Sequence, residues 1–228
     1  MLEELKERVC IANKQLEQYG LVKLTWGNVS GIDINRELIV IKPSGVSFER
    51  LTPDDLCVVD LNGKIVEGKL NPSSDLPTHL VLYRHFNSIG GVVHTHSTYA
   101  TAWAQAGKNI PVLGTTHADS FYGDVPCARG LTPQEINESY EHSTGEVIVE
   151  TFANIDPDAV PGVILKNHGP FTWGKNPEKA LENSVILEEC AKLAYYSLQI
   201  NPNIQMDQNL VEKHYQRKHG KNAYYGQK

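Results

Sequence analysis

The chain has 228 residues, of which 40% are hydrophobic and 21% charged, and its net charge is −6 at pH 7. This length and composition fit one globular domain with a substantial core. A basic stripe and a run of about 18 apolar residues are both missing, which argues against nucleic acid as a partner and against a membrane span. The acidic N-terminus lacks the apolar stretch of a signal peptide, and the four cysteines are scattered. We therefore expect free thiols and a cytoplasmic protein.

The first third of the chain favours one helix followed by short strands. Apolar residues recur at helical spacing over residues 2–19, and Gly20 ends the pattern. Strands at 57–61 and 64–67 flank Asn62-Gly63, a dipeptide typical of a type I′ hairpin turn. Further short strands are predicted at 21–25, 29–34 and 38–41.

Helices dominate the rest of the chain. Thr132, Pro133 and Glu135 form a capping-box pattern that opens a helix toward Phe152. A strand is expected at 163–166. The other predicted helices cover 76–86, 98–106, 177–199 and 208–218. Because there is no repeat or linker, we predict a single α/β domain over residues 1–228, with a mainly antiparallel sheet covered by helices.

Two histidines lie two residues apart in segment 90–97, where an apolar run after a glycine pair indicates a strand. Residues i and i+2 of a strand point to the same face, so His94 and His96 present their imidazoles side by side. His168 follows the apolar run 163–165 and is a third candidate. Three imidazoles with a carboxylate or water would bind a divalent metal able to polarise a carbonyl. The alternative is that this pair belongs to the ordinary surface or core.

Three loops have the composition of an anion site, at 25–30, 42–45 and 72–75. Glycine lets the backbone approach a ligand closely, while serine hydroxyls and the N–H groups of a helix N-terminus suit a phosphate. Lys42 adds a positive charge. Turn geometry alone also explains each loop separately. Asp75 could cap a helix or face the imidazoles, and Asp119 could cap a turn or transfer protons.

Taken together, the motifs resemble the class II aldolase/adducin superfamily, from Leu16 to the C-terminus. Within it, the tail at 213–227 most resembles the L-ribulose-5-phosphate 4-epimerases. The motifs that carry the resemblance are TWGNVS at 25–30, KPSG at 42–45, PSSD at 72–75, HTH at 94–96, GTTHAD at 114–119 and NHG at 167–169.

The resemblance implies a role for each matching position. A divalent metal, usually zinc with manganese as an alternative, would be bound by His94, His96 and His168, with Asp75 as a further ligand or neighbour. The substrate, chiefly its phosphate, would be held by Gly27, Asn28, Lys42, Ser44, Gly45, Ser73 and Ser74. Asp119 and Tyr225 (or the adjacent Tyr224) would carry protons, with Thr115 and His214 in support.

The resemblance also implies a reaction and an assembly. Retro-aldol cleavage of the C3–C4 bond and re-addition to the other face of the aldehyde would interconvert L-ribulose 5-phosphate and D-xylulose 5-phosphate. Members of the superfamily form homotetramers with active sites at subunit interfaces. Its aldolases typically carry a glutamate near the position of Asp75, a difference that favours the epimerase. A sugar-phosphate aldolase, a related dehydratase and a non-catalytic adducin-like scaffold are the alternatives.

Overall fold

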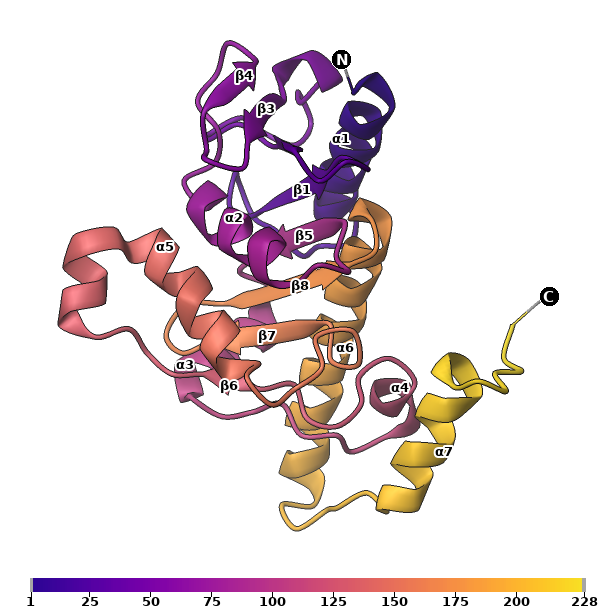
Figure 1. Cartoon of the computed structure of the whole chain (residues 1–228). Coiled ribbons are helices and arrows are strands. Elements are labelled where there is room, and N and C mark those ends of the chain that lie inside the picture. Colours follow the sequence, from indigo (N-terminus) through magenta and orange to yellow (C-terminus); the bar gives the residue numbers. More distant parts are fainter. Residues whose placement is uncertain (1, 227–228) are drawn as a thin grey trace.

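The computed structural model describes residues 2–226, so Gln227 of the tail motif lies outside the described residues. One sheet of eight strands runs through the molecule in the order β4-β3-β2-β1-β5-β8-β7-β6 (Figure 1). Neighbouring strands are antiparallel except β6 and β7, so the predicted α/β class with a mainly antiparallel sheet is confirmed. The strands are β1 (Asn28–Ile32), β2 (Leu38–Ile41), β3 (Cys57–Asp60), β4 (Ile65–Glu67), β5 (Gly91–His94), β6 (Cys127–Ala128), β7 (Gly162–Leu165) and β8 (Pro170–Gly174).

Helices cover both faces of this sheet. α1 (Glu3–Gln18) and α6 (Pro177–Ile200) pack on one face, while α2 (Leu76–His85), with α5 (Pro133–Thr151) against it, lies on the other (Figure 1). The remaining helices are the short η1 (Pro53–Asp55), α3 (Thr98–Ala106), α4 (Thr115–Ala118) and α7 (Gln208–His219).

Alternating strand residues divide the core between the two faces. Val40 and Val58 pack with Val9 of α1, whereas Ile39 and Val59 pack in the cluster that contains Leu80 of α2. All of these side chains are buried. This two-residue alternation is the reason that the short strands share one sheet with both faces covered.

The antiparallel order brings four chain segments to the same end of the sheet. Asn28 opens β1 and lies opposite His94, the last residue of β5, which in turn lies opposite Phe171 of β8. Lys42 directly follows β2, and the β7–β8 turn at 166–169 meets the same end. The register of the sheet therefore positions the residues of the site.

The last helix, α7, lies outside the sheet and does not cover it (Figure 1). α7 packs against α4, and Figure 1 shows both at the opposite end of the molecule from the β3–β4 hairpin. The N-terminus of α7 is capped by the Asp207 side chain, which accepts a hydrogen bond from the amide of Asn209 at 2.7 Å.

Two local predictions are wrong. The predicted strand at 21–25 is irregular, because Leu21 and Val22 bury their side chains against α1 while Leu24 is left-handed and 74% exposed. The predicted hairpin forms, but its turn is not type I′. Only Gly63 has a positive φ (80°), and its amide bonds to the Asp60 carbonyl, the pattern of a three-residue loop with a glycine bulge.

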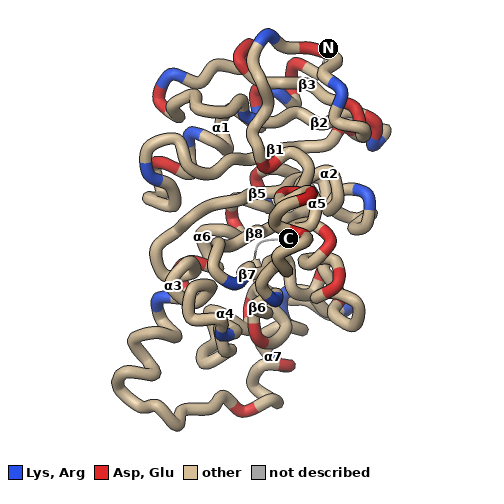
Figure 2. Tube along the Cα trace, turned by 90° about the vertical axis from the view of Figure 1, so that its left-hand side faces the viewer, with Lys and Arg blue, Asp and Glu red and all other residues tan. Residues whose placement is uncertain are grey.

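Among residues 2–226, no helix combines the length and apolar character needed to cross a bilayer. Basic and acidic residues are interspersed along the trace (Figure 2).

Candidate active site

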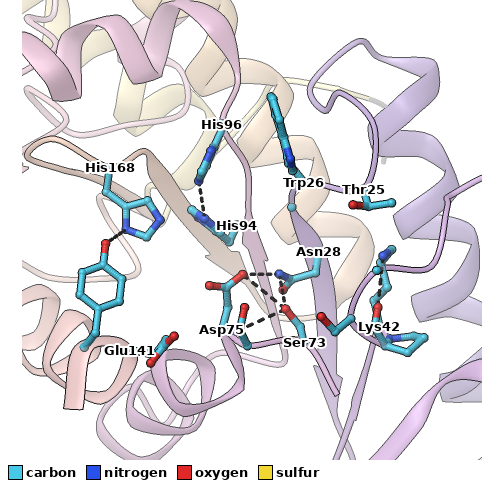
Figure 3. Close-up of a pocket in the computed structure, with 16 residues that line it drawn as sticks. Thr25, Trp26, Asn28, Lys42, Ser73, Asp75, His94, His96, Glu141 and His168 are labelled. Atoms are coloured by element: carbon cyan, nitrogen blue, oxygen red, sulfur yellow. Dashed lines mark hydrogen bonds between the residues drawn. The ribbon is translucent and has the colours of Figure 1, made fainter. Parts of the chain in front are cut away.

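Three histidines converge at the sheet end described above. His94 closes β5, His96 lies two residues farther along, and His168 sits in the β7–β8 turn (Figure 3). That turn is tight because Asn167 adopts a left-handed conformation (φ 63°), which asparagine tolerates better than most residues. One nitrogen of each imidazole lies within 4.8 Å of the others, the only such group of potential metal ligands among residues 2–226.

The imidazoles are oriented by contacts on their outer sides. Pro170 presents its carbonyl oxygen 3.0 Å from Nδ1 of His94, so Nδ1–H donates and Nε2 keeps its lone pair for the centre. His94 also stacks on Phe171 at a centroid distance of 4.2 Å. Its Nε2 lies 3.1 Å from Nε2 of His96. Two ring nitrogens therefore point at the same place.

The charge state of the cluster suits a metal. Burial, together with the neighbouring His94 and His96, lowers the pKa of His168 to about 3. Burial also lowers the pKa of His96. Neutral imidazoles are the form that binds a divalent ion. The donor set of these residues fits a zinc-type ion with further ligands left to water or substrate.

The segment after the histidines is held by helix α6. Glu188 accepts hydrogen bonds from the amides of Tyr99 and Ala100, both at 2.9 Å. A carboxylate at this position satisfies free N–H groups in the first turn of α3 and suits the helix dipole. The chain on the far side of His96 is therefore fixed to the longest helix of the described residues.

The histidines form one wall of a cavity of about 450 Å³. Every residue predicted to bind metal or substrate lines it, although these residues come from segments that lie far apart in the sequence. The lining consists of Thr25, Trp26, Gly27, Asn28, Lys42, Pro43, Ser44, Gly45, Ser73, Ser74, Asp75, His94, His96, Tyr140, Glu141 and His168.

The loops at 42–45 and 72–75 come together through backbone pairing. Ser44 N–H donates to the Asn71 carbonyl and Ser73 N–H donates to the Lys42 carbonyl, both at 3.0 Å. Gly45 is left-handed (φ 71°) with open space where a Cβ would be. Gly27 has no such room, because a Cβ there would lie 2.8 Å from the His94 carbonyl oxygen. Glycine at 27 thus lets the first loop approach the histidine strand.

Asp75 is half-buried beside the cluster and is ionised. Asn28 donates to its Oδ2 at 2.7 Å, and Ser73 lies 3.4 Å from the same oxygen. Burial opposes ionisation, but nearby imidazoles, first His94, and the Asn28 hydrogen bond lower the pKa of Asp75 below its ordinary value. Asp75 lies outside the group of three converging imidazoles, so its predicted role as a ligand stays a prediction.

Lys42 supplies a buried cation on the other side of the cavity. Its side chain is almost wholly buried, and within residues 2–226 its ammonium has no ion pair. Nζ instead donates to the Pro43 carbonyl at 3.2 Å and lies 4.8 Å from the Phe48 ring. Burial lowers the pKa of Lys42 to about 8. A buried lysine without a carboxylate is poised for an anionic ligand.

Two lining residues lie outside all of the motifs that the sequence indicates. Tyr140 and Glu141 reach the cavity from α5, where Ser139 interrupts the helical backbone (φ −162°, ψ 67°). The Tyr140 hydroxyl lies 3.3 Å from Nδ1 of His168, and Figure 3 shows Glu141 on the same side. A polar pair within a helix is ordinarily a solvated face, so only the kink distinguishes these residues, and no pattern in the sequence indicates it.

The predicted proton carriers lie elsewhere. Asp119, at the end of α4, and Tyr225, in the tail, line a separate cavity of about 480 Å³. His214, predicted in support, contacts Asp119 through Nδ1 at 2.9 Å. Thr115 opens α4, and its carbonyl accepts the amide of Asp119. Within one chain, these four residues do not join the histidine cavity.

Comparison with known proteins identifies a family and several solved structures that resemble this chain. The family model described as the Class II Aldolase and Adducin N-terminal domain matches residues 7–195. An L-fuculose 1-phosphate aldolase structure is 28% identical, with a TM-score of 0.78 over 92% of this chain and 95% of that chain. YgbL from Klebsiella pneumoniae is 26% identical (TM-score 0.75; 93% and 99%). The L-fuculose-1-phosphate aldolase from Thermus thermophilus is 25% identical (TM-score 0.70; 89% and 99%).

Proposed function

Because the chain belongs to the class II aldolase and adducin family, we propose that it is a metal-dependent L-ribulose-5-phosphate 4-epimerase. The observation that carries the proposal is that one cavity joins three converging imidazoles to a buried lysine and two loops that carry serines. A sugar phosphate needs both halves, one for its oxygen functions and one for its phosphate.

The anion half keeps the cleaved fragment in place. Lys42, the hydroxyls of Ser44 and Ser73, and the open backbone at Gly45 offer charge and donors to a phosphate. An epimerase must retain its aldehyde fragment until the bond reseals, whereas an aldolase releases it. A phosphate site that holds the fragment through several donors therefore serves epimerisation.

The histidine half would hold a divalent ion, with zinc the ion that we expect. When bound there, the ion supplies Lewis-acid stabilisation of the negative charge that develops on the ketose oxygens. The protein's own contribution is orientation. Pro170 fixes the tautomer of His94, and the Glu188 contact with α3 fixes the segment after His96.

Asp119 and Tyr225 would move protons on the two faces of the aldehyde. Inversion needs one group to accept the C4 hydroxyl proton and another to give a proton on the opposite side. Both residues lie outside the histidine cavity, which supports a site shared between subunits of a homotetramer. Tyr225 is 60% exposed, so its ring is available to a neighbouring copy.

The alternative is a sugar-phosphate aldolase, favoured by the 28% identity to an L-fuculose 1-phosphate aldolase. Asp75 is the residue that argues against it, since its short side chain is bound by Asn28 and Ser73 rather than free to reach a substrate. We propose that the epimerase acts in the cytoplasm, in the catabolism of arabinose or another pentose.

The decisive experiment is a coupled assay for D-xylulose 5-phosphate formed from L-ribulose 5-phosphate, with and without a chelator. We expect turnover that the chelator abolishes and a divalent ion restores. Release of free glycolaldehyde phosphate and dihydroxyacetone without epimerisation would identify an aldolase. Purified protein that binds no divalent ion and turns over neither substrate would support the adducin-like scaffold.

A further inference from the structure

The residues expected to transfer protons are 106 positions apart in sequence, yet one arginine of α7 contacts both. Nε of Arg217 donates to Oδ1 of Asp119 at 3.0 Å, and its terminal nitrogen donates to Oδ2 at 2.7 Å. The guanidinium carbon lies 4.9 Å from the centre of the Tyr225 ring. A planar guanidinium is suited to both contacts, because it binds a carboxylate with two hydrogen bonds and stacks on aromatic faces.

The backbone of Arg217 adds a third link. Its carbonyl oxygen accepts hydrogen bonds from the amides of Tyr224 and Tyr225, at 3.0 and 3.2 Å. The tail therefore folds back onto the end of α7, and the Tyr225 ring covers Arg217 and Lys218. These backbone bonds remain in any Arg217 variant, so the link that a substitution removes is the contact of the guanidinium with the Tyr225 ring.

We infer that Arg217 is the positioning residue that holds Asp119 and Tyr225 as one pair and places its cation against the carboxylate. The inference rests on the proposed function, in which these two groups exchange protons with substrate. Arg217 itself acts through Asp119 and Tyr225.

The surroundings of Asp119 explain why Arg217 matters most among its neighbours. His214, Lys218 and His219 of α7 also face it; Lys218 is 3.4 Å away, and the His219 ring contacts only the Asp119 carbonyl. Partial burial opposes ionisation, but hydrogen bonds from Arg217 and then His214 outweigh it and lower the pKa of Asp119. Other charged groups lining the same cavity are Asp158, Lys175, Lys179 and Glu182, of which Lys179 and Glu182 pair with each other.

The test compares Arg217→Met with Arg217→Lys in the metal-loaded enzyme. Loss of positioning in Arg217→Met should lower kcat by on the order of 10²-fold, with KM changed little because the phosphate is bound elsewhere. Loss of the cation should move the acid limb of the kcat/KM profile to higher pH, by about one pH unit or more. Arg217→Lys, which keeps the charge but not the two-point geometry, should recover part of both effects.

Arg8→Met is the matched control. Arg8 makes an equally close two-point contact, with Glu178 at 2.8 Å for both bonds, but far from both proton carriers. It should leave kcat and the acid limb at wild-type values. A loss in Arg217→Met with an unmoved acid limb, or an equal loss in Arg8→Met, would overturn the inference.

A readout that does not use turnover separates this inference from the proposed function. Carbon-13 NMR of carboxyl-labelled aspartate, with Asp119 assigned by Asp119→Asn, should show Asp119 titrating at higher pH in Arg217→Met and, by a smaller amount, in Arg217→Lys. If wild-type protein does not epimerise the substrate but Asp119 shifts as stated, the proposed function fails and the Arg217 contact stands. If Asp119 titrates identically in all three proteins, the inference is wrong whatever the activity.

Discussion

The histidine cavity and the Asp119 cluster are built in different ways. The cavity is made by sheet strands and the loops at their ends, and its parts meet because the register places Asn28, His94 and Phe171 side by side. The Asp119 cluster is made by helix α7 and the tail folded against the short helix α4. The first is a cavity at the end of the sheet, whereas the second includes Tyr225, which is 60% exposed.

This difference suggests a division of labour. Under the proposed function, binding of the ion and of the phosphate would depend on the cavity, and proton transfer would depend on the cluster. Variants in the two regions should therefore have different defects. Cavity variants should lose metal or substrate binding, whereas cluster variants should lose turnover alone.

His96→Asn should cause the largest loss. Removing one of three imidazoles should abolish stoichiometric metal binding and lower turnover by on the order of 10³-fold or more, since the ion contributes several kcal/mol of charge stabilisation. Metal analysis of the purified variant and the coupled assay measure both. His85→Asn, at an exposed histidine on α2, is the control and should retain both. A metal-free variant with full turnover would remove the ion from the mechanism.

Tyr225→Phe should lower kcat by about 10²- to 10⁴-fold while the bound metal stays at wild-type content, as expected for loss of one proton carrier. Tyr224→Phe is its control, because the Tyr224 ring lies over Lys213 rather than Arg217. If Tyr224→Phe lowered kcat and Tyr225→Phe did not, Tyr224 would be the proton carrier instead.

Mixing the two inactive proteins sharpens the same comparison. If each site takes its histidines from one subunit and Tyr225 from the next, co-refolded His96→Asn and Tyr225→Phe chains should regain activity, up to about a quarter of wild type for random assembly in a ring. No recovery from mixed oligomers, verified by tagged chains, would place both groups in the same subunit.

Lys42→Met should act on binding alone. Losing a charge-assisted contact to phosphate should raise KM by about 10- to 100-fold and leave the metal content unchanged. Because the pKa of Lys42 is about 8, its charge is lost as pH rises through that value, so kcat/KM of wild type should fall above pH 8. Lys64→Met, in the exposed β3–β4 hairpin, is the control. An unchanged KM would remove Lys42 from the phosphate site.

The smallest effect concerns stability. His79 is fully buried behind the cavity, its Nδ1 bonded to Ser30 at 2.7 Å, and burial lowers its pKa from 6.5 to about 3. The unfolded chain therefore binds a proton between pH 6.5 and 3 that the native protein does not, so stability is full above pH 6.5 and falls with pH by up to about 1.4 kcal/mol per pH unit. Urea unfolding at pH 7 and pH 5.5, with chelator present, should show a smaller pH dependence for His79→Gln than for wild type or His85→Gln. Equal dependence would show that His79 titrates normally.

Local patterns predicted much of this protein. The His94–His96 pair, the loop serines and Lys42 could be identified because each lies next to a strand end or helix start that the sequence marks clearly. Tyr140 and Glu141 could not, because their position depends on a helix interruption at Ser139. The separation of Asp119 from the cavity was equally hidden, since it depends on how α7 packs on α4, a contact between segments far apart in the sequence.

The turn that carries His168 has a consequence for how such proteins change over time. The third imidazole is contributed by a few residues between β7 and β8, outside both strands. A substitution of His168 would remove one of the three imidazoles and leave the residues of β7 and β8 unchanged. Homologous proteins could thus lose the metal site during evolution, keep the fold and serve in non-catalytic roles.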